Sequence, residues 1–208
     1  MTADPLAVIR RIRETPPAPR PRAGERCEMC TEPIPDEHNH LVDVVQRNLM
    51  CTCRGCWLLF TPQGAGGGHF KAVPERYAAF PDLHLSPAQW DSLQIPVSVA
   101  FFFVNSTLER VCAFYPSPAG ATESLLPLDT WDELTATHAE LGRLEPDVEA
   151  FLVRFDRATT QGECYLVPID TCYELVGQLR SLWHGFDGGT EAHATLDALF
   201  DGVRAKAR

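Results

Sequence analysis

The sequence predicts an α+β protein in which a small metal-binding module precedes a domain with a mainly antiparallel sheet. Three observations indicate this class: five of the eight cysteines lie within residues 27–56, a glycine-rich stretch follows them, and short apolar runs then alternate with capped helical segments. At 208 residues the chain is long enough for a small module joined to a medium-sized core.

Residues 1–26 are expected to form a basic arm that ends in a proline-rich linker. They contain six arginines and three acids, a balance of +3, and because the whole chain carries −10, residues 27–208 carry −13. PLAVIRRIRE has apolar residues near helical spacing, whereas TPPAPRPRAGER has four prolines in twelve residues and is typical of a semi-rigid linker. Such an arm either contacts an acidic or nucleic-acid partner or remains a solvated tail.

The spacing of the cysteines predicts a metal site. CEMC places Cys27 and Cys30 in one C-x2-C turn, and CTCRGC places Cys53 and Cys56 in another. Each turn can direct two thiolates at one ion, and together they supply the four tetrahedral ligands that zinc prefers. We therefore expect these four cysteines to bind zinc; reduced core thiols are the alternative explanation of the pattern.

The region between the two pairs predicts a β-hairpin, because LVDVVQRNLMC alternates around a turn at residues 46–48. The order of knuckle, hairpin and second knuckle resembles the zinc-ribbon and treble-clef families over residues 27–60. CRGCWLLF, which can begin a helix after the second pair, favours the treble clef. A segment of this size buries little apolar surface, so metal binding, worth about 10 kcal/mol or more in such peptides, would drive its folding.

Other ligands and another metal remain open. On a strand Cys51 and Cys53 would face the same side, so Cys51 is a possible substitute for Cys53. His38 or His40 from the sequence HNH could also replace a cysteine. Four thiolates hold iron as well, in a rubredoxin-like site or an iron–sulfur cluster, and the protein would then be a redox helper. Against rubredoxin, neither pair is followed by the glycine that this family shows.

A linker and an α+β domain are expected after the module. The linker TPQGAGGG, residues 61–68, lacks the Gly-Lys-Ser/Thr ending of a phosphate-binding loop. In the domain, residues 69–208, SPAQWDSL has Ser86 as an N-cap and Gln89 to complete a capping box. VSVAFFFV and RVCAFYP predict adjacent strands joined by the turn NSTLE.

The rest of the domain predicts a helix, a hairpin and two further helices. LDTWDELTATHAEL predicts a helix capped by Asp129, and AFLVRFDRATTQGECYLVPI predicts two strands around a turn. Asp170 is expected to cap the helix TCYELVGQLRSLW, and Thr190 is expected to cap the last helix. The apolar face of that helix consists of Leu196, Leu199, Phe200 and Val203.

The segment YPSPAGATESLLP, residues 115–127, is expected to be an ordered loop. Pro116, Pro118 and a glycine fix its shape, and its hydrogen-bonding groups are those of Ser117, Thr122, Glu123 and Ser124. Ordered loops on a rigid scaffold often bind other molecules, so this is a candidate partner-binding loop. The alternative is a connection whose polar groups satisfy only its own backbone.

The motifs taken in order resemble an uncharacterised bacterial family over roughly residues 27–205. They are CxxC, HxH, CxCxxC, IPVSVAFFF, YPSPAGATESLLPLD, EPDVEAFLV and VPIDTCYELVGQLRSLW. Genes of that family lie beside those of high-affinity nickel–iron hydrogenases and their maturation factors. The resemblance implies an accessory role in the assembly or operation of a hydrogenase, with a hydrogenase subunit or a maturation factor as the protein partner.

Several function classes are disfavoured. No apolar run approaches the roughly 20 residues of a membrane helix, and the N-terminus has no stretch of signal-peptide length, so we expect a cytoplasmic protein. The net charge of −10 disfavours nucleic acid as a main partner. No nucleophile is paired with a base in the sequence, so we expect a non-catalytic zinc-binding accessory protein rather than an enzyme.

Overall fold

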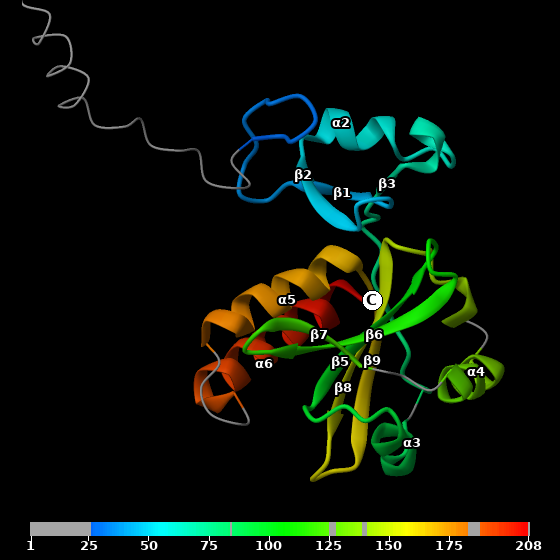
Figure 1. Ribbon diagram of the computed structural model, residues 1–208. Coiled ribbons are helices and arrows are strands. Elements are labelled where there is room, and N and C mark those ends of the chain that lie inside the picture. Colours follow the sequence, from blue (N-terminus) through cyan, green and yellow to red (C-terminus); the bar gives the residue numbers. More distant parts are fainter. Residues whose placement is uncertain (1–25, 84, 125–127, 139–140, 183–187, 208) are drawn as a thin grey trace, which may run out of the picture.

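The computed structural model describes residues 26–83, 85–124, 128–138, 141–182 and 188–207. A small sheet lies above a larger sheet that is covered by helices (Figure 1). The fold is α+β with antiparallel strand pairings, as the sequence predicts. The helix and most of the linker that the sequence predicts before residue 26 lie outside the described residues.

The small sheet has the strand order β2-β1-β3. Strands β1 (Asn39–Asp43) and β2 (Asn48–Thr52) form the expected hairpin, and helix α2 (Arg54–Leu59) begins almost directly after β2. Strand β3 (Phe70–Ala72) follows the glycine-rich stretch and still pairs with β1. The small sheet therefore extends beyond residue 60, where the sequence alone suggests that the module ends.

The glycine-rich stretch contains the short 3-10 helix η1 (Ala65–Gly68), which returns the chain to the small sheet. Gly66 has a φ of 58°, and a Cβ atom at this position would lie 2.8 Å from Cε1 of Phe60. Glycine alone fits both the left-handed backbone and the close ring. The glycine at position 66 thus lets the backbone pass close to the ring of Phe60.

The large sheet has the strand order β4-β9-β8-β5-β6-β7. Its strands are β4 (Ala78–Ala79), β5 (Val99–Asn105), β6 (Arg110–Ser117), β7 (Gly120–Ser124), β8 (Glu149–Asp156) and β9 (Gln161–Pro168). The two hairpins that the sequence predicts, β5–β6 and β8–β9, are confirmed.

Helices cover both faces of the large sheet (Figure 1). Two of them, α5 (Ile169–Leu182) and α6 (Gly189–Lys206), lie on one face. On the other face are α3 (Pro87–Ser92), α4 (Leu128–Thr137) and the short η2 (Leu141–Arg143). No helix among the described residues is long and apolar enough to span a membrane.

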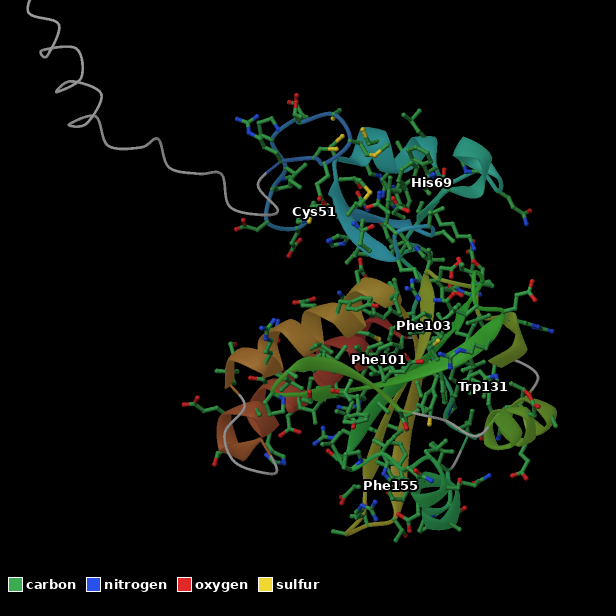
Figure 2. All side chains as sticks on the ribbon, in the orientation of Figure 1. Cys51, His69, Phe101, Phe103, Trp131 and Phe155 are labelled. Atoms are coloured by element: carbon green, nitrogen blue, oxygen red, sulfur yellow. The ribbon has the colours of Figure 1, made fainter. Side chains whose placement is uncertain are left out.

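Strand β5 divides its side chains between these two helical layers. Phe101 and Phe103 join the core formed with α5 and α6, whereas Phe102 joins the core that contains Trp90 and Trp131. Figure 2 shows Phe101 and Phe103 on the side of α5 and Trp131 on α4. Because both faces are buried, β5 can be apolar at nearly every position, which explains the continuous run VAFFFV.

The helix caps are predicted correctly only in part. Ser86 caps α3, and its capping box with Gln89 is complete. The other three predictions are wrong, because α5 begins at Ile169, α6 at Gly189 and α4 at Leu128. Asp170, Thr190 and Asp129 therefore lie inside the first turns of their helices.

The prediction of a long loop at residues 115–127 is also wrong. Strand β7 occupies 120–124 and pairs with β6, from Gly120 opposite Ser117 to Ser124 opposite Ala113. The proline and glycine residues of this segment indicate a turn, but the turn takes only residues 118–119. Residues 115–117 form the end of β6, and residues 120–124 form β7, an edge strand of the large sheet.

The module and the large domain share one core. Val42 of β1 and Val73 after β3 belong to the same buried cluster as Phe101 and the apolar face of α5. Lys71 of β3 donates a hydrogen bond of 2.8 Å to the carboxylate of Asp147, which precedes β8. Apolar packing and an ion pair thus fix the position of the small sheet on the large one.

Replacing Arg76, which lies between β3 and β4, is predicted to destabilise this junction. Arg76 donates hydrogen bonds of 2.8 and 2.6 Å to the carboxylate of Glu149, whose side chain is only 2% exposed. Arg76→Ala leaves a buried carboxylate without its cation and should lower the free energy of unfolding by about 3 kcal/mol. Urea denaturation measures this loss.

The matched control is Arg157→Ala, which removes an ion pair with Asp91 that is 60% exposed on both sides. Its cost should be at most about 1 kcal/mol, because exposed pairs contribute little. Equal losses in the two variants would contradict the importance of the buried carboxylate.

Candidate metal centre

The four cysteines of the two C-x2-C pairs meet between the loop before β1 and the start of α2. The backbone N–H of Thr31 donates 2.7 Å to the carbonyl of Cys27, which closes the first turn around Cys27 and Cys30. Cys53 is the N-cap of α2, and its Sγ accepts a 3.4 Å hydrogen bond from the N–H of Cys56. All four sulfur atoms lie within 4.8 Å of one another.

The spacing of the sulfur atoms is that of a tetrahedral metal site. Four sulfurs placed about 2.3 Å from one ion lie about 3.8 Å apart. The Sγ atoms of Cys30 and Cys53 are separated by 3.7 Å. The four-cysteine cluster can therefore hold a metal ion with little movement of its side chains.

Ionisation of the cluster is uneven. Burial opposes ionisation of Cys27, but hydrogen bonds from the backbone N–H groups of Cys53, Cys30 and Met29 outweigh it and lower the pKa of Cys27 to about 6. Burial, followed by the neighbouring sulfurs, raises the pKa of Cys56. Four adjacent thiols thus need a cation nearby before all of them can lose their protons.

Helix α2 is held in place from the other side by Trp57. Its buried indole donates 2.9 Å to the carbonyl of Val73, and the guanidinium of Arg54 lies 4.1 Å above its ring. Arg54 also pairs with Glu75 at 2.8 Å. These contacts connect the helix that carries Cys56 to the strand that follows the glycine-rich stretch.

The remaining candidate ligands do not join this cluster. His38, His40 and Cys51 form a second group, with one ring nitrogen of each histidine and the sulfur of Cys51 within 4.8 Å of one another. Figure 2 places Cys51 on the hairpin. The sequence contains a signal for this second group. Residues two apart on a strand face the same side, which puts His38 and His40 together, and a hairpin can place Cys51 opposite them.

The candidate partner-binding residues of the β6–β7 segment are engaged within the protein. Thr122 donates 2.8 Å to Ser117, and Ser117 donates 3.1 Å to the carbonyl of Gly120. Glu123 pairs with Arg110 at 2.7 Å. The buried hydroxyl of Ser124 donates 3.0 Å to the carbonyl of Leu93. These interactions favour the alternative that the polar groups satisfy the structure itself.

A sequence model of a family of unknown function (DUF5947) matches residues 26–207. The chain belongs to this family. The matched region includes all four cysteines, the second group and both sheets, so the family unit comprises the module and the domain together. The expectation of an uncharacterised family is confirmed, and the link to hydrogenase genes stays a prediction. No curated protein and no solved structure matches the chain.

Thr31, which follows the first cysteine pair, is predicted to store backbone strain. Its φ is 65°, a left-handed conformation that is unfavourable for a β-branched residue. Thr31→Gly should relieve about 1 kcal/mol of this strain, part of which the greater entropy of the unfolded chain offsets. A rise of about 2 °C in the thermal midpoint is expected.

The neighbouring exposed residue Glu32, which is not among the residues with positive φ, is the control. Glu32→Gly should lower the midpoint, because it adds chain entropy without relieving strain. Equal changes in both variants would show that the left-handed conformation of Thr31 carries no strain.

Proposed function

We propose that the protein is a non-catalytic accessory protein whose four-cysteine cluster binds a structural zinc ion. The observation that supports this best is the gathering of Cys27, Cys30, Cys53 and Cys56, with a sulfur separation of 3.7 Å that suits one tetrahedral ion. Four protein thiolates fill the coordination sphere, and a filled sphere is typical of a structural rather than a catalytic zinc site.

The arrangement around the cysteines supports a treble-clef interpretation of the module. One pair lies in a turn before the β1–β2 hairpin, and the other pair lies at the N-terminus of α2 directly after it. The treble clef, which the sequence resembles, has this order of knuckle, hairpin and helix. The ion would hold the two ends of the hairpin together.

Iron is the second candidate, because four thiolates also suit a single iron ion. The structure favours zinc on one point: the second pair leads into α2, with Cys53 as its N-cap and Trp57 within the helix, whereas rubredoxin has a glycine after each pair. An iron–sulfur cluster would also separate the cysteine sulfurs further, since its sulfides lie between them.

The proposed action is a protein–protein contact. Of the six exposed large apolar side chains among the described residues, four lie in the segment that the metal would fold: Met29, Val45, Leu58 and Leu59. Leu58 and Leu59 of α2 are 51% and 68% exposed. Exposed apolar side chains of this kind favour a protein partner, and the resemblance described above suggests a hydrogenase subunit or a maturation factor.

Metal analysis tests the structural zinc. We expect the anaerobically purified protein to contain zinc and to be colourless, and we expect Cys56→Ser to lose its zinc together with the folded module, because the ion supplies the folding energy. Elemental mass spectrometry, a visible spectrum and hydrogen exchange of residues 27–60 measure these effects. Cys112→Ala, a buried thiol in the large domain, should keep its zinc. Iron with visible absorption bands would replace this proposal by the redox alternative.

Co-purification tests the protein contact. The double variant Leu58→Ser/Leu59→Ser should reduce recovery of the co-expressed hydrogenase subunit or maturation factor by about tenfold or more, because exposed leucines of α2 would lose their contact. The control is Leu108→Ser, which changes a 42% exposed leucine in the β5–β6 turn. Unchanged recovery with the double variant, or an equal loss with the control, would contradict a contact through α2.

A further inference from the structure

Two histidines and a cysteine meet on one face of the β1–β2 hairpin. His40 lies directly opposite Cys51 in the strand register, and His38 precedes His40 by two residues, the spacing that returns to the same face. One ring nitrogen of each histidine and the sulfur of Cys51 lie within 4.8 Å of one another. The centres of the two imidazole rings are 4.7 Å apart.

The hydrogen bonds of His38 leave one of its nitrogens available for a metal. Its Nδ1 atom is 2.9 Å from the carbonyl of Pro35 and 3.0 Å from that of Asp36. Carbonyl oxygens only accept, so Nδ1 carries the hydrogen and Nε2 carries a lone pair. Nε2 is buried, and nothing in the described part of the chain forms a hydrogen bond with it. A buried acceptor without a partner needs an explanation, and a bound ion is one such explanation.

His40 is oriented in the same way by a carboxylate from the large domain. Its Nδ1 atom lies 2.9 Å from Oδ2 of Asp170, at the start of α5. Because a carboxylate accepts, Nδ1 carries a hydrogen, and in the neutral imidazole that a metal binds the lone pair is then on Nε2. A histidine that binds a metal through one ring nitrogen usually donates the N–H of the other nitrogen to an acceptor such as a carboxylate, which fixes the orientation of the ring.

We propose that His38, His40 and Cys51 form a second metal site, separate from the four-cysteine cluster, that binds zinc with one coordination position open. Two neutral imidazoles and one thiolate are donors that suit zinc and neighbouring divalent transition metals. One ring nitrogen of each histidine and the sulfur of Cys51 now lie within 4.8 Å of one another. Side-chain shifts of about 1 Å would bring all three atoms to bonding distance of one zinc ion. Three protein ligands leave a fourth position for water or another small molecule.

A cavity adjoins the two histidines of the proposed site. His38 and His40 line a cavity of about 440 Å³ between the small sheet and the large domain, whose wall also includes Tyr77, Asp170 and Lys206. The ammonium of Lys206 lies 5.0 Å from the centre of the Tyr77 ring. The same wall also carries the carboxylates of Glu75 and Asp170. With three protein ligands, the proposed site differs from the four-cysteine cluster, in which four ligands would surround the ion completely.

The number of zinc ions per chain tests the proposal. Full-length protein is loaded with Zn²⁺, freed of loosely bound metal by gel filtration and measured by elemental mass spectrometry. We expect two zinc ions per chain in the unchanged protein and one in His40→Ala and in Cys51→Ala. His69→Ala is the matched control: His69 belongs to the same module but contacts Asp43 at 3.0 Å, and this variant should keep both ions.

The result separates this site from the structural zinc. A single zinc that His40→Ala keeps and Cys56→Ser loses overturns the second site and leaves the proposed function intact. A single zinc that His40→Ala loses and Cys56→Ser keeps supports the second site and overturns the structural zinc. Loss of an ion in His69→Ala as well would show that any histidine change disturbs the module, and would count against the site.

Asp170→Asn provides a second test of the site, because this variant keeps all three proposed ligands and removes only the carboxylate that orients His40. Competition with a chelating dye should show affinity lower by about 10- to 100-fold at one of the two zinc sites. The control is Glu75→Gln, which lines the same cavity but pairs with Arg54 and should leave both affinities unchanged. Unchanged affinity in Asp170→Asn, or an equal loss in Glu75→Gln, would overturn the positioning role of Asp170 and the site built on it.

Discussion

Electrostatic repulsion among the thiolates of the four-cysteine cluster is the main constraint on the small module, because it opposes ionisation of all four cysteines together. The backbone N–H groups around Cys27 stabilise its thiolate, whereas burial and the adjacent sulfurs oppose ionisation of Cys56. A divalent cation removes this opposition for all four at once. It would also hold the turn before β1 against the first turn of α2, so that the two ends of the β1–β2 hairpin are closed by the same ion.

Strand β1 connects this cluster to the rest of the protein. It is the central strand of the small sheet, and its Val42 packs into the core formed with α5 and α6. His40, from the same strand, reaches Asp170 at the start of α5. The module has too little apolar surface to form its own core, so packing on the large domain stabilises it from one side, and a metal in the four-cysteine cluster would stabilise it from the other.

The features that the sequence predicts correctly have local signals. The cysteine spacing, the capping box of Ser86 and the apolar runs of β5 and β8 each occupy one short segment. The pairing of β3 with β1 was not predictable, because three residues carry no periodic pattern. The contact of His40 with Asp170 joins residues 130 positions apart, and only the folded chain brings them together.

The misplaced helix caps and the missed strand have a related cause. An aspartate before a helical run and one inside its first turn look alike in a sequence, and Asp170 proves to be the second kind, with its Oδ2 directed at His40. The glycine and prolines near β7 indicate a turn correctly, but they do not show that the chain pairs again directly after it. In both cases tertiary contacts decide between two locally reasonable conformations.

The sequence CTCRGC serves both groups of candidate ligands because the strand ends within it. Strict alternation would place Cys51 and Cys53 on one face, but β2 ends at Thr52 and Cys53 caps α2. Cys51 therefore stays opposite His40, and Cys53 turns away toward Cys56. The first turn also fixes Cys51, since its backbone N–H donates to the carboxylate of Glu28 and its carbonyl accepts 2.9 Å from the N–H of Glu28. In the proposed arrangement the two sites are therefore coupled, because the turn that carries Cys27 and Cys30 also holds the backbone of Cys51, which the hairpin register places opposite His40.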